Sequence, residues 1–220
     1  GAHIDVNLGN GLCRQYSLCN NPAESHRYLI GVLKEPVSRG GSQAMHERVR
    51  EGDRLTISAP RNLFALDRAG SRYLLFAGGI GITPIVPMVQ AAAAAGLDWH
   101  LLYLARNAAD FIFLQELQEV DGARITTHAS NQDGLFDLQG ALQALDAQTV
   151  VYSCGPQPLL AALENYQQEQ ADIGWQLVLE ATRDLVTETV KVETPMEPVE
   201  TRIITEQLVA IPGLALAALL

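Results

Sequence analysis

Apolar and polar positions alternate along the first sixty residues of the chain. Alternation with a period of about two residues is typical of strands that bury one face. It predicts strands at residues 3–8, 12–18, 28–35 and 53–60. The turn-forming stretches GNG, NNPAES and RGGS separate them, and a short helix is expected near residues 43–49. This half of the chain therefore predicts an antiparallel β-barrel or sandwich.

The pattern changes from about residue 72 onward, where strand-like and helix-like segments alternate four times. Alternating strands and helices predict a parallel sheet with helices on its faces. The strand-like segments are 72–79, 99–106, 124–130 and 149–155, and the helix-like segments are 83–96, 113–120, 138–145 and 158–168. The expected fold class is therefore β + α/β. We expect a barrel domain at 1–68, an α/β domain at 69–176 and a divergent tail of unknown role at 177–220.

Composition excludes several classes of function. The chain has 220 residues, 48% of them hydrophobic, and a net charge of -10, and its two lysines do not form the basic surface that nucleic acid requires. The three cysteines form no CxxC pair, which favours a reducing cytoplasm. The longest apolar run, at 208–220, is interrupted by Pro212 and Gly213 and is shorter than the roughly 20 residues that span a bilayer. Neither a nucleic-acid nor a membrane partner is expected.

The clearest chemical signal is the sequence AGGIGITP, from Ala77 to Pro84. Glycines such as Gly79 and Gly81 at the end of a strand let the backbone approach a ligand, and the helix that follows offers free N–H groups to a phosphate. Thr83 is the expected N-cap and Pro84 the expected first helical residue. A plain strand-to-helix turn is the alternative.

A second glycine-bearing turn, SCGP, ends the last predicted strand at Ser153–Pro156. Ligands of open parallel sheets bind beyond the carboxyl ends of the strands, so the two turns predict one crevice. Arg106 ends another strand at this edge and is a candidate partner for a cofactor phosphate or ribose. The alternatives are a small buried hydrophobic residue for Cys154 and a solvated surface residue for Arg106.

The sequence RQYSL, Arg14 to Leu18, places unusual chemistry on a predicted strand. An arginine supplies a permanently charged donor fork for phosphate, and Tyr16 supplies a stacking surface. In the sequence SRGGS, which begins at Ser38, the two glycines expose backbone N–H groups to an anion. The structural alternatives are a surface ion pair for Arg14, the edge of a core for Tyr16 and a flexible turn for SRGGS.

The four motifs RQYSL, SRGGS, AGGIGITP and CGP, in this order along the chain and at these spacings, resemble the phthalate dioxygenase reductase and vanillate O-demethylase reductase group of the ferredoxin reductase superfamily. Members of this group are flavin reductases that serve Rieske oxygenases, and the resemblance covers about residues 1–175. It implies that Arg14 binds the flavin phosphate, that Tyr16 flanks the cofactor and that Ser17 hydrogen-bonds near the reactive flavin N5. Ser17 and Cys154 are the implied catalytic residues. The further cofactor-binding positions that it implies are Leu18, Val32, Lys34, Gly40, Gly41, Ser42, Gly79, Gly81, Thr83, Pro84, Arg106, Gly155 and Pro156.

The resemblance also implies an activity. We expect an NADH-dependent flavoprotein reductase that passes electrons to a Rieske-type oxygenase or a separate ferredoxin. RGGS, rather than a longer adenosine-binding pattern, favours FMN over FAD, and NADH is favoured over NADPH. The alternatives are an inactive fragment that binds nucleotide, an interaction subunit, and a free-standing flavin reductase that acts on diffusible acceptors.

The chain also departs from the group. Members have two further strands before the position of Gly1, so we expect an incomplete barrel with an exposed edge. Members also continue into a ferredoxin domain with C-x4-C-x2-C spacing, but this chain has no cysteine after Cys154 and no aromatic residue after Trp175. We therefore expect no [2Fe-2S] cluster in this chain. The five histidines show no metal-ligand spacing, so no metal site is expected.

Overall fold

The computed structural model of the chain describes residues 1–34, 40–182, 199–204 and 214–219, the last two ranges as backbone alone. The chain divides into two compact units. One comprises Gly1–Leu63 with the described residues after Arg183, and the other comprises Phe64–Thr182. None of the helices in these described ranges is both long and apolar enough to cross a membrane.

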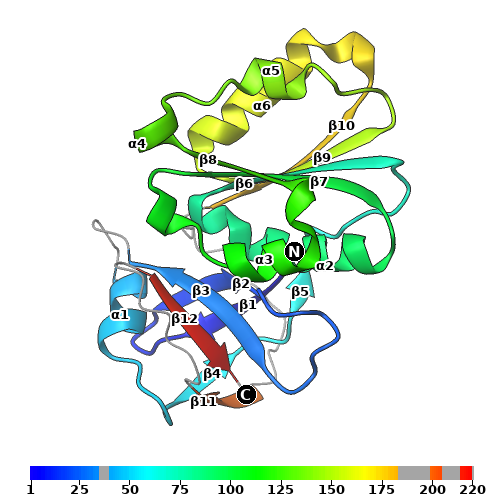
Figure 1. Cartoon of the computed structure of the whole chain (residues 1–220). Helices are drawn as coiled ribbons and strands as arrows, with labels where there is room; N and C mark the ends of the chain where they lie inside the picture. The colour runs from blue at the N-terminus through cyan, green and yellow to red at the C-terminus, as the bar shows by residue number, and fades with distance from the viewer. Residues whose placement is uncertain (35–39, 183–198, 205–213, 220) are drawn as a thin grey trace. The chain divides into compact units, whose positions relative to one another are not determined.

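The first unit is an antiparallel seven-stranded sheet with the strand order β2-β1-β4-β11-β12-β3, and β5 pairs with β1 (Figure 1). An isolated antiparallel bridge between Leu18 and Ile30 connects the two ends of this order. A short helix, α1 (Gly41–Glu47), follows β3. The strands are β1 (Ala2–Asn7), β2 (Cys13–Ser17), β3 (Tyr28–Leu33), β4 (Arg54–Ile57), β5 (Arg61–Asn62), β11 (Val199–Ile204) and β12 (Leu214–Leu219).

The core of this unit follows from the alternation in the sequence. Ile4 and Val6 of β1 are fully buried, because side chains two positions apart lie on one face of a strand. They pack in one cluster with Leu18, Ile30, Val32, Met45 and Ile57.

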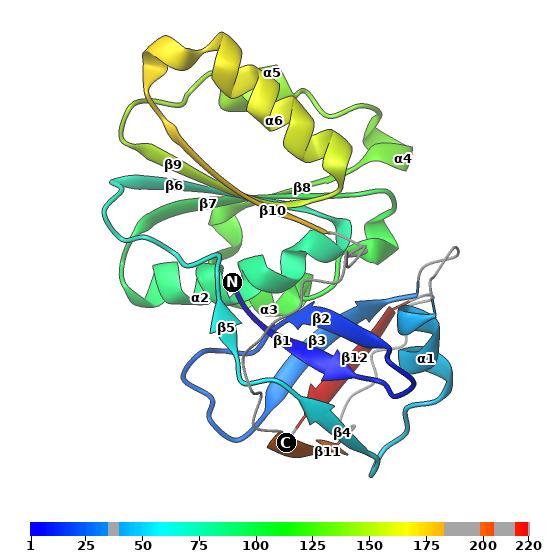
Figure 2. The same cartoon turned by 180° about the vertical axis from the view of Figure 1, so that it is seen from behind.

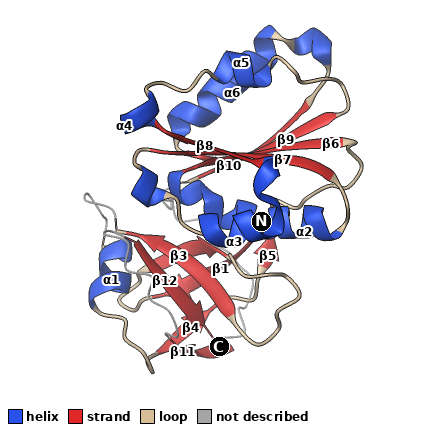
Figure 3. Cartoon of the chain, viewed as in Figure 1, coloured by secondary structure: helices blue, strands red, loops and turns tan. Residues whose placement is uncertain are grey.

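The second unit is a parallel five-stranded sheet with the order β10-β9-β6-β7-β8. Helices α2 and α3 cover one face of this sheet and α5 and α6 cover the other, as the strands and helices in Figures 2 and 3 show. The strands are β6 (Arg72–Gly78), β7 (Asp98–Ala105), β8 (Ile125–Ala129), β9 (Thr149–Gly155) and β10 (Gln176–Ala181). The helices are α2 (Ile82–Ala94), α3 (Leu114–Asp121), α4 (Ser130–Asp133), α5 (Leu138–Leu142) and α6 (Gln157–Glu169).

The predicted fold class, antiparallel strands followed by a parallel α/β unit, is confirmed. The structure adds a fifth parallel strand, β10, within the segment that was expected to be a tail. Leu177 and Leu179 of β10 pack against the core cluster that contains Leu163 of α6, which explains why this segment joins the sheet. The structure also adds the two-residue strand β5, which lies between β4 and β6 in the chain.

The expected exposed edge of the first sheet also differs from the structure. β11 pairs with β4, and β12 pairs with β3. The exposed edge was expected because members of the group have two further strands before the position of Gly1, whereas the two strands that pair with β3 and β4 here come from beyond residue 198. The domain boundaries that the sequence suggested stay a prediction.

Candidate cofactor-binding sites

The two glycine-bearing turns lie at the switch point of the parallel sheet. From β6 the chain continues through β7 to β8 on one side, whereas β9 and β10 lie on the other side of β6. β6 and β9 are neighbours in register, with Ala77 opposite Cys154. The switch point of an open α/β sheet is where a crevice opens beyond the carboxyl ends of the strands. The turns after β6 and β9 therefore form its two sides.

Glycine allows the backbones of these turns to touch. A Cβ atom on Gly81 would collide with the carbonyl oxygen of Cys154 and would lie 2.8 Å from the amide nitrogen of Gly155. Gly79 is different, because it has a φ of +55° and a Cβ atom there would meet nothing within 4 Å. Packing within the protein explains Gly81, and Gly79 is the glycine of the pair that leaves open space for a ligand.

The first turn of α2 differs from the prediction. Gly81 is the N-cap, and Thr83 and Pro84 lie inside the helix, so the prediction of Thr83 as N-cap was wrong. The reason is that the 3-10 turn Gly79–Gly81 runs directly into the helix, with Gly81 already in the helical region. Thr83 is buried and donates a hydrogen bond of 2.9 Å to the carbonyl oxygen of Ile80.

The helix after the second turn begins as expected. Pro156 is the N-cap of α6, and Gly155 is the buried last residue of β9. α2 and α6 thus start directly after adjacent strands, and the positive ends of their dipoles face this edge of the sheet. The N–H of Ile82 already donates to the carbonyl oxygens of Gly79 and Ile80, and the N–H of Leu159 donates to that of Pro156.

Cys154 lies beside a carboxyl group that sequence reasoning missed. Its side chain is only 3% exposed, and burial, with a smaller contribution from the charge of Glu180, raises the pKa of its thiol. Glu180 of β10 is the register partner of Cys154, its Oε2 atom is buried without a hydrogen-bond partner among the described residues, and burial raises its pKa. The signal in the sequence was an acidic residue at the end of the apolar run QLVLEA.

Arg106 follows β7 at the same edge of the sheet. Its side chain is exposed, and its backbone oxygen accepts a hydrogen bond of 3.0 Å from the amide of Asn131. The sequence thus correctly placed Arg106 at the carboxyl edge of the sheet. Its contact with a cofactor stays a prediction.

In the first unit, the structure brings together two motifs that are far apart in the sequence. Arg14 of β2 lies across Gly41, the first residue of α1, so that a Cβ atom on Gly41 would lie 2.6 Å from Cγ of Arg14. Gly40 has a φ of +90° and is the N-cap of this helix. The aliphatic part of the Arg14 side chain thus lies against the backbone at Gly41, which Gly40 and Ser42 flank. Ser38 and Arg39 of the motif lie outside the described residues.

The other predicted flavin residues fall into two groups. Leu18 and Val32 belong to the core cluster and Tyr16 packs partly buried against it, whereas Ser17 lies on the opposite face of β2. Lys34 forms an exposed ion pair of 3.0 Å with Glu47 of α1. The side chain of Val32 therefore packs in the core, and that of Lys34 forms an ion pair. A contact of either residue with a cofactor stays a prediction.

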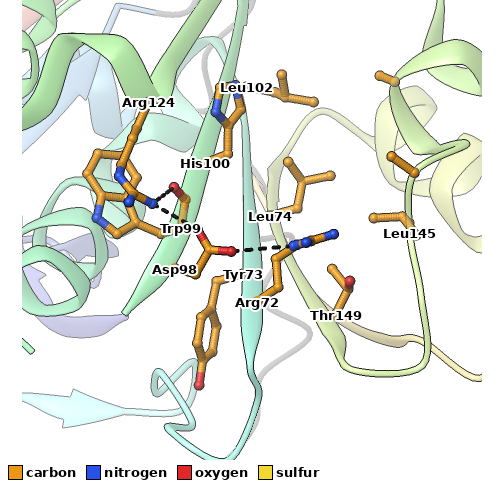
Figure 4. Close-up of a pocket in the computed structure, with 12 residues that line it drawn as sticks. Arg72, Tyr73, Leu74, Asp98, Trp99, His100, Leu102, Arg124, Leu145 and Thr149 are labelled. Carbon is orange, nitrogen blue, oxygen red and sulfur yellow. Dashed lines mark hydrogen bonds and ion pairs between the residues drawn. The ribbon is translucent and has the colours of Figure 1, made fainter. Parts of the chain in front are cut away.

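The second unit also has a pocket of about 350 Å³ at the opposite edge of its sheet (Figure 4). The first residues of β6, β7 and β9, which are Arg72, Asp98 and Thr149, line it. Asp98 pairs with Arg72 at 3.4 Å and with Arg124 at 2.9 Å. These charges pair with one another, and the pocket is separate from the glycine turns.

The described residues hold no group of three or more His, Cys, Asp or Glu side chains that could bind a metal ion.

Comparison with known proteins agrees with a nucleotide-binding role for the second unit. Residues 75–165 match the oxidoreductase NAD-binding domain. The chain is 50% identical over 158 residues to the vanillate O-demethylase oxidoreductase of Pseudomonas putida, which covers 71% of this chain and 50% of that protein. The chain spans about half the length of such relatives.

Two solved structures have the same fold. Phthalate dioxygenase reductase superposes with a TM-score of 0.74 at 33% identity, over 81% of this chain and 57% of that one. Full-length CYP116B46 from Tepidiphilus thermophilus gives a TM-score of 0.78 at 40% identity, over 82% of this chain and 24% of that one. The chain is thus similar in sequence to the vanillate O-demethylase oxidoreductases and in sequence and fold to phthalate dioxygenase reductase, and its residues 75–165 match the oxidoreductase NAD-binding domain.

Proposed function

We propose that the chain is an NADH-dependent flavoprotein reductase that delivers electrons to the oxygenase component of a Rieske-type system, directly or through a separate ferredoxin. The observation that carries this proposal is the position of Arg14 across Gly41, because it unites the two motifs that a flavin phosphate would need. The printed names of relatives support the acceptor class, since they include a reductase subunit of a carnitine monooxygenase and a phenoxybenzoate dioxygenase subunit.

In the first unit, the residues fit a flavin phosphate. Arg14 supplies a charged donor fork, and a Cβ atom at Gly40 would meet nothing within 4 Å, so the backbone there is open to an anion, whereas Gly41 lies under the Arg14 side chain. The hydroxyl of Ser42 adds a donor. Ser17, on the other face of β2, is the group that would donate a hydrogen bond to the flavin N5.

In the second unit, the residues fit a nicotinamide dinucleotide. Gly79 leaves room for the pyrophosphate, and the positive dipole ends of α2 and α6 favour its negative charge. Burial and, to a smaller extent, the charge of Glu180 raise the pKa of the Cys154 thiol, which favours a neutral thiol over a nucleophilic thiolate at this turn. When bound, the two cofactors would supply the redox chemistry, which is hydride donation by the nicotinamide to the flavin and release of single electrons by the flavin.

We further propose FMN and NADH as the specific cofactors. The short RGGS motif leads into α1 without an additional adenosine-binding stretch, which favours the smaller flavin. Arg106 is the candidate contact to the ribose or phosphate of the nicotinamide cofactor, and its exposure leaves it available.

The test is to prepare the apo-protein, add FMN or FAD, and record the flavin absorbance before and after NADH or NADPH under anaerobic conditions. The proposal expects a yellow protein that NADH bleaches. A preparation that binds NADH but neither flavin would support the nucleotide-binding fragment instead. Rapid reduction of free flavin or quinones, with no transfer to an oxygenase or ferredoxin, would support the free-standing flavin reductase.

A further inference from the structure

The two C-terminal strands lie between strands of the first unit. β12 pairs with β3 over six residues, from Leu214 opposite Leu33 to Leu219 opposite Tyr28. β11 pairs with β4 over four residues, from Val199 opposite Ile57 to Arg202 opposite Arg54. The two strands also pair with each other near Ile203 and Leu219. Figure 1 shows β12, in red, beside β3, in blue. Together they connect β3 to β4.

Without β12, β3 would keep little of its pairing. Its other link in the described sheet is the bridge between Leu18 and Ile30, with a hydrogen bond of 2.7 Å from the amide of Cys19 to the carbonyl oxygen of Leu29. Unpaired backbone groups along a strand are costly when buried, and an open edge also permits register slips and association with other chains. β12 is therefore the main source of backbone pairing for β3.

The composition of β12 fits an interior strand. Residues 214–219 are only leucine and alanine. Natural edge strands are usually protected by charged residues, proline or bulges, and this strand has no charged residue and no proline. The sequence thus agrees with a strand that has a neighbour on each side.

β3 in turn holds the helix that begins the candidate phosphate site. The ring Nε2 of His46 in α1 lies 2.9 Å from the carbonyl oxygen of Val32, and Lys34, just after β3, pairs with Glu47 of α1. The other end of α1 is Gly41, against which Arg14 lies. Contacts therefore run from β12 through β3 and α1 to Arg14.

From these contacts we propose that residues 199–204 and 214–219 are integral strands of the flavin-binding unit, and that the unit retains flavin only with these strands of its own chain in place. The flavin part of this inference rests on the proposed function. The strand part stands on backbone pairing alone.

The test uses the full chain with proline substitutions in β12. Adjacent residues of a strand direct their amides to opposite sides, so one of Leu216→Pro and Ala217→Pro removes a donor that faces β3. Leu216→Val and Ala217→Val are the matched controls, because valine keeps the amide and favours a strand. Hydrogen exchange of β3 peptides is measured without flavin, and FMN affinity is measured by fluorescence quenching.

We expect at least one proline variant to speed exchange in β3 and to weaken FMN binding about tenfold or more, a factor that corresponds to about 1.4 kcal/mol. Both valine variants should behave as the wild type. Exchange in β6 of the second unit should stay slow in all variants, which separates a local effect from global unfolding. A variant that unfolds throughout is replaced by a chain that ends at Thr182, examined by the same β3 and β6 exchange.

Unchanged exchange in β3 in both proline variants and in the shortened chain would overturn the proposal. An FMN affinity that falls on dilution, together with a dimeric mass, would assign the strands to a second copy and overturn the assignment within one chain. A wild type that binds neither FMN nor FAD would overturn the proposed function and the flavin part of this inference, while β3 exchange would still decide the strand part.

Discussion

Arg14 and Gly41 meet although one lies on β2 and the other begins α1. A Cβ atom on Gly41 would lie 2.6 Å from Cγ and 2.9 Å from Cδ of Arg14, so the contact requires glycine at this position. The RQYSL and SRGGS motifs thus become parts of one surface. An arginine beside the backbone of a glycine turn is an arrangement suited to phosphate.

The first prediction is that Arg14→Ala weakens FMN binding. Loss of a hydrogen bond to a charged group costs about 1.5 to 3 kcal/mol, which corresponds to roughly 10- to 150-fold in affinity. Titration of the apo-protein with FMN measures it. Arg48→Ala is the matched control, because Arg48 is an exposed arginine at the other end of α1 and should leave the affinity unchanged. Equal affinity in the Arg14 variant and the wild type would remove Arg14 from the site.

The second prediction separates the two glycines of the AGGIGITP motif. Gly81→Ala drives a Cβ atom into the backbone of Cys154, so it should destabilise the second unit by about 1 to 3 kcal/mol. Gly79→Ala makes no collision and incurs only the strain of a positive φ, roughly 1 to 2 kcal/mol. Because its Cβ atom would enter the space proposed for the pyrophosphate, Gly79→Ala should slow flavin reduction by NADH without loss of bound FMN. Thermal unfolding and stopped-flow bleaching distinguish the two.

The interpretation of Gly81 would be wrong if Gly81→Ala were as stable as the wild type. If Gly79→Ala were reduced at the normal rate, the turn would be a structural feature without a role in nucleotide binding.

Sequence reasoning succeeded where a local pattern determines the structure and failed where distant residues determine it. The alternation around Ile4 and Val6 predicts their burial, and the two glycine motifs predict the carboxyl edge of the sheet. The strand β10 was missed because its five partly buried residues show no clear alternation, and its place depends on pairing with β9. Glu180 was missed for the same reason, since only that pairing brings it beside Cys154.

The third prediction concerns the pH dependence of stability that Glu180 causes. Because burial raises the pKa of Glu180, the folded chain binds this proton more tightly than the unfolded chain. The ionised carboxylate therefore lowers the free energy of unfolding. This penalty is absent below the ordinary glutamate pKa of 4.5, and it grows as the pH rises from that value through the raised pKa of the folded state.

Glu180→Gln removes this ionisation, so the variant should be more stable than the wild type at neutral pH, and the difference should shrink as the pH falls toward 4.5. Denaturant unfolding of both proteins across this pH range measures it. Glu164→Gln, at an exposed position of α6, is the control and should leave the pH dependence unchanged. A stability difference between Glu180→Gln and the wild type that does not vary with pH would assign the effect of Glu180 to packing instead of charge.

The last prediction concerns the path of the electrons after the flavin. A plant-type [2Fe-2S] cluster requires four closely spaced thiolates, and this 220-residue chain has three cysteines, Cys13, Cys19 and Cys154. Cys13 is exposed at the start of β2, whereas Cys19 is buried, and burial raises the pKa of its thiol to about 12, which disfavours the thiolate that iron requires. The purified chain should therefore contain no stoichiometric iron or acid-labile sulfide, and a Rieske oxygenase tested with it should turn over slowly until a separate ferredoxin is added. Iron and sulfide assays, with electron paramagnetic resonance after dithionite reduction, measure the first expectation. A cluster signal of one per monomer would contradict it, and rapid oxygenase turnover without added ferredoxin would instead show direct transfer from the flavin to the oxygenase.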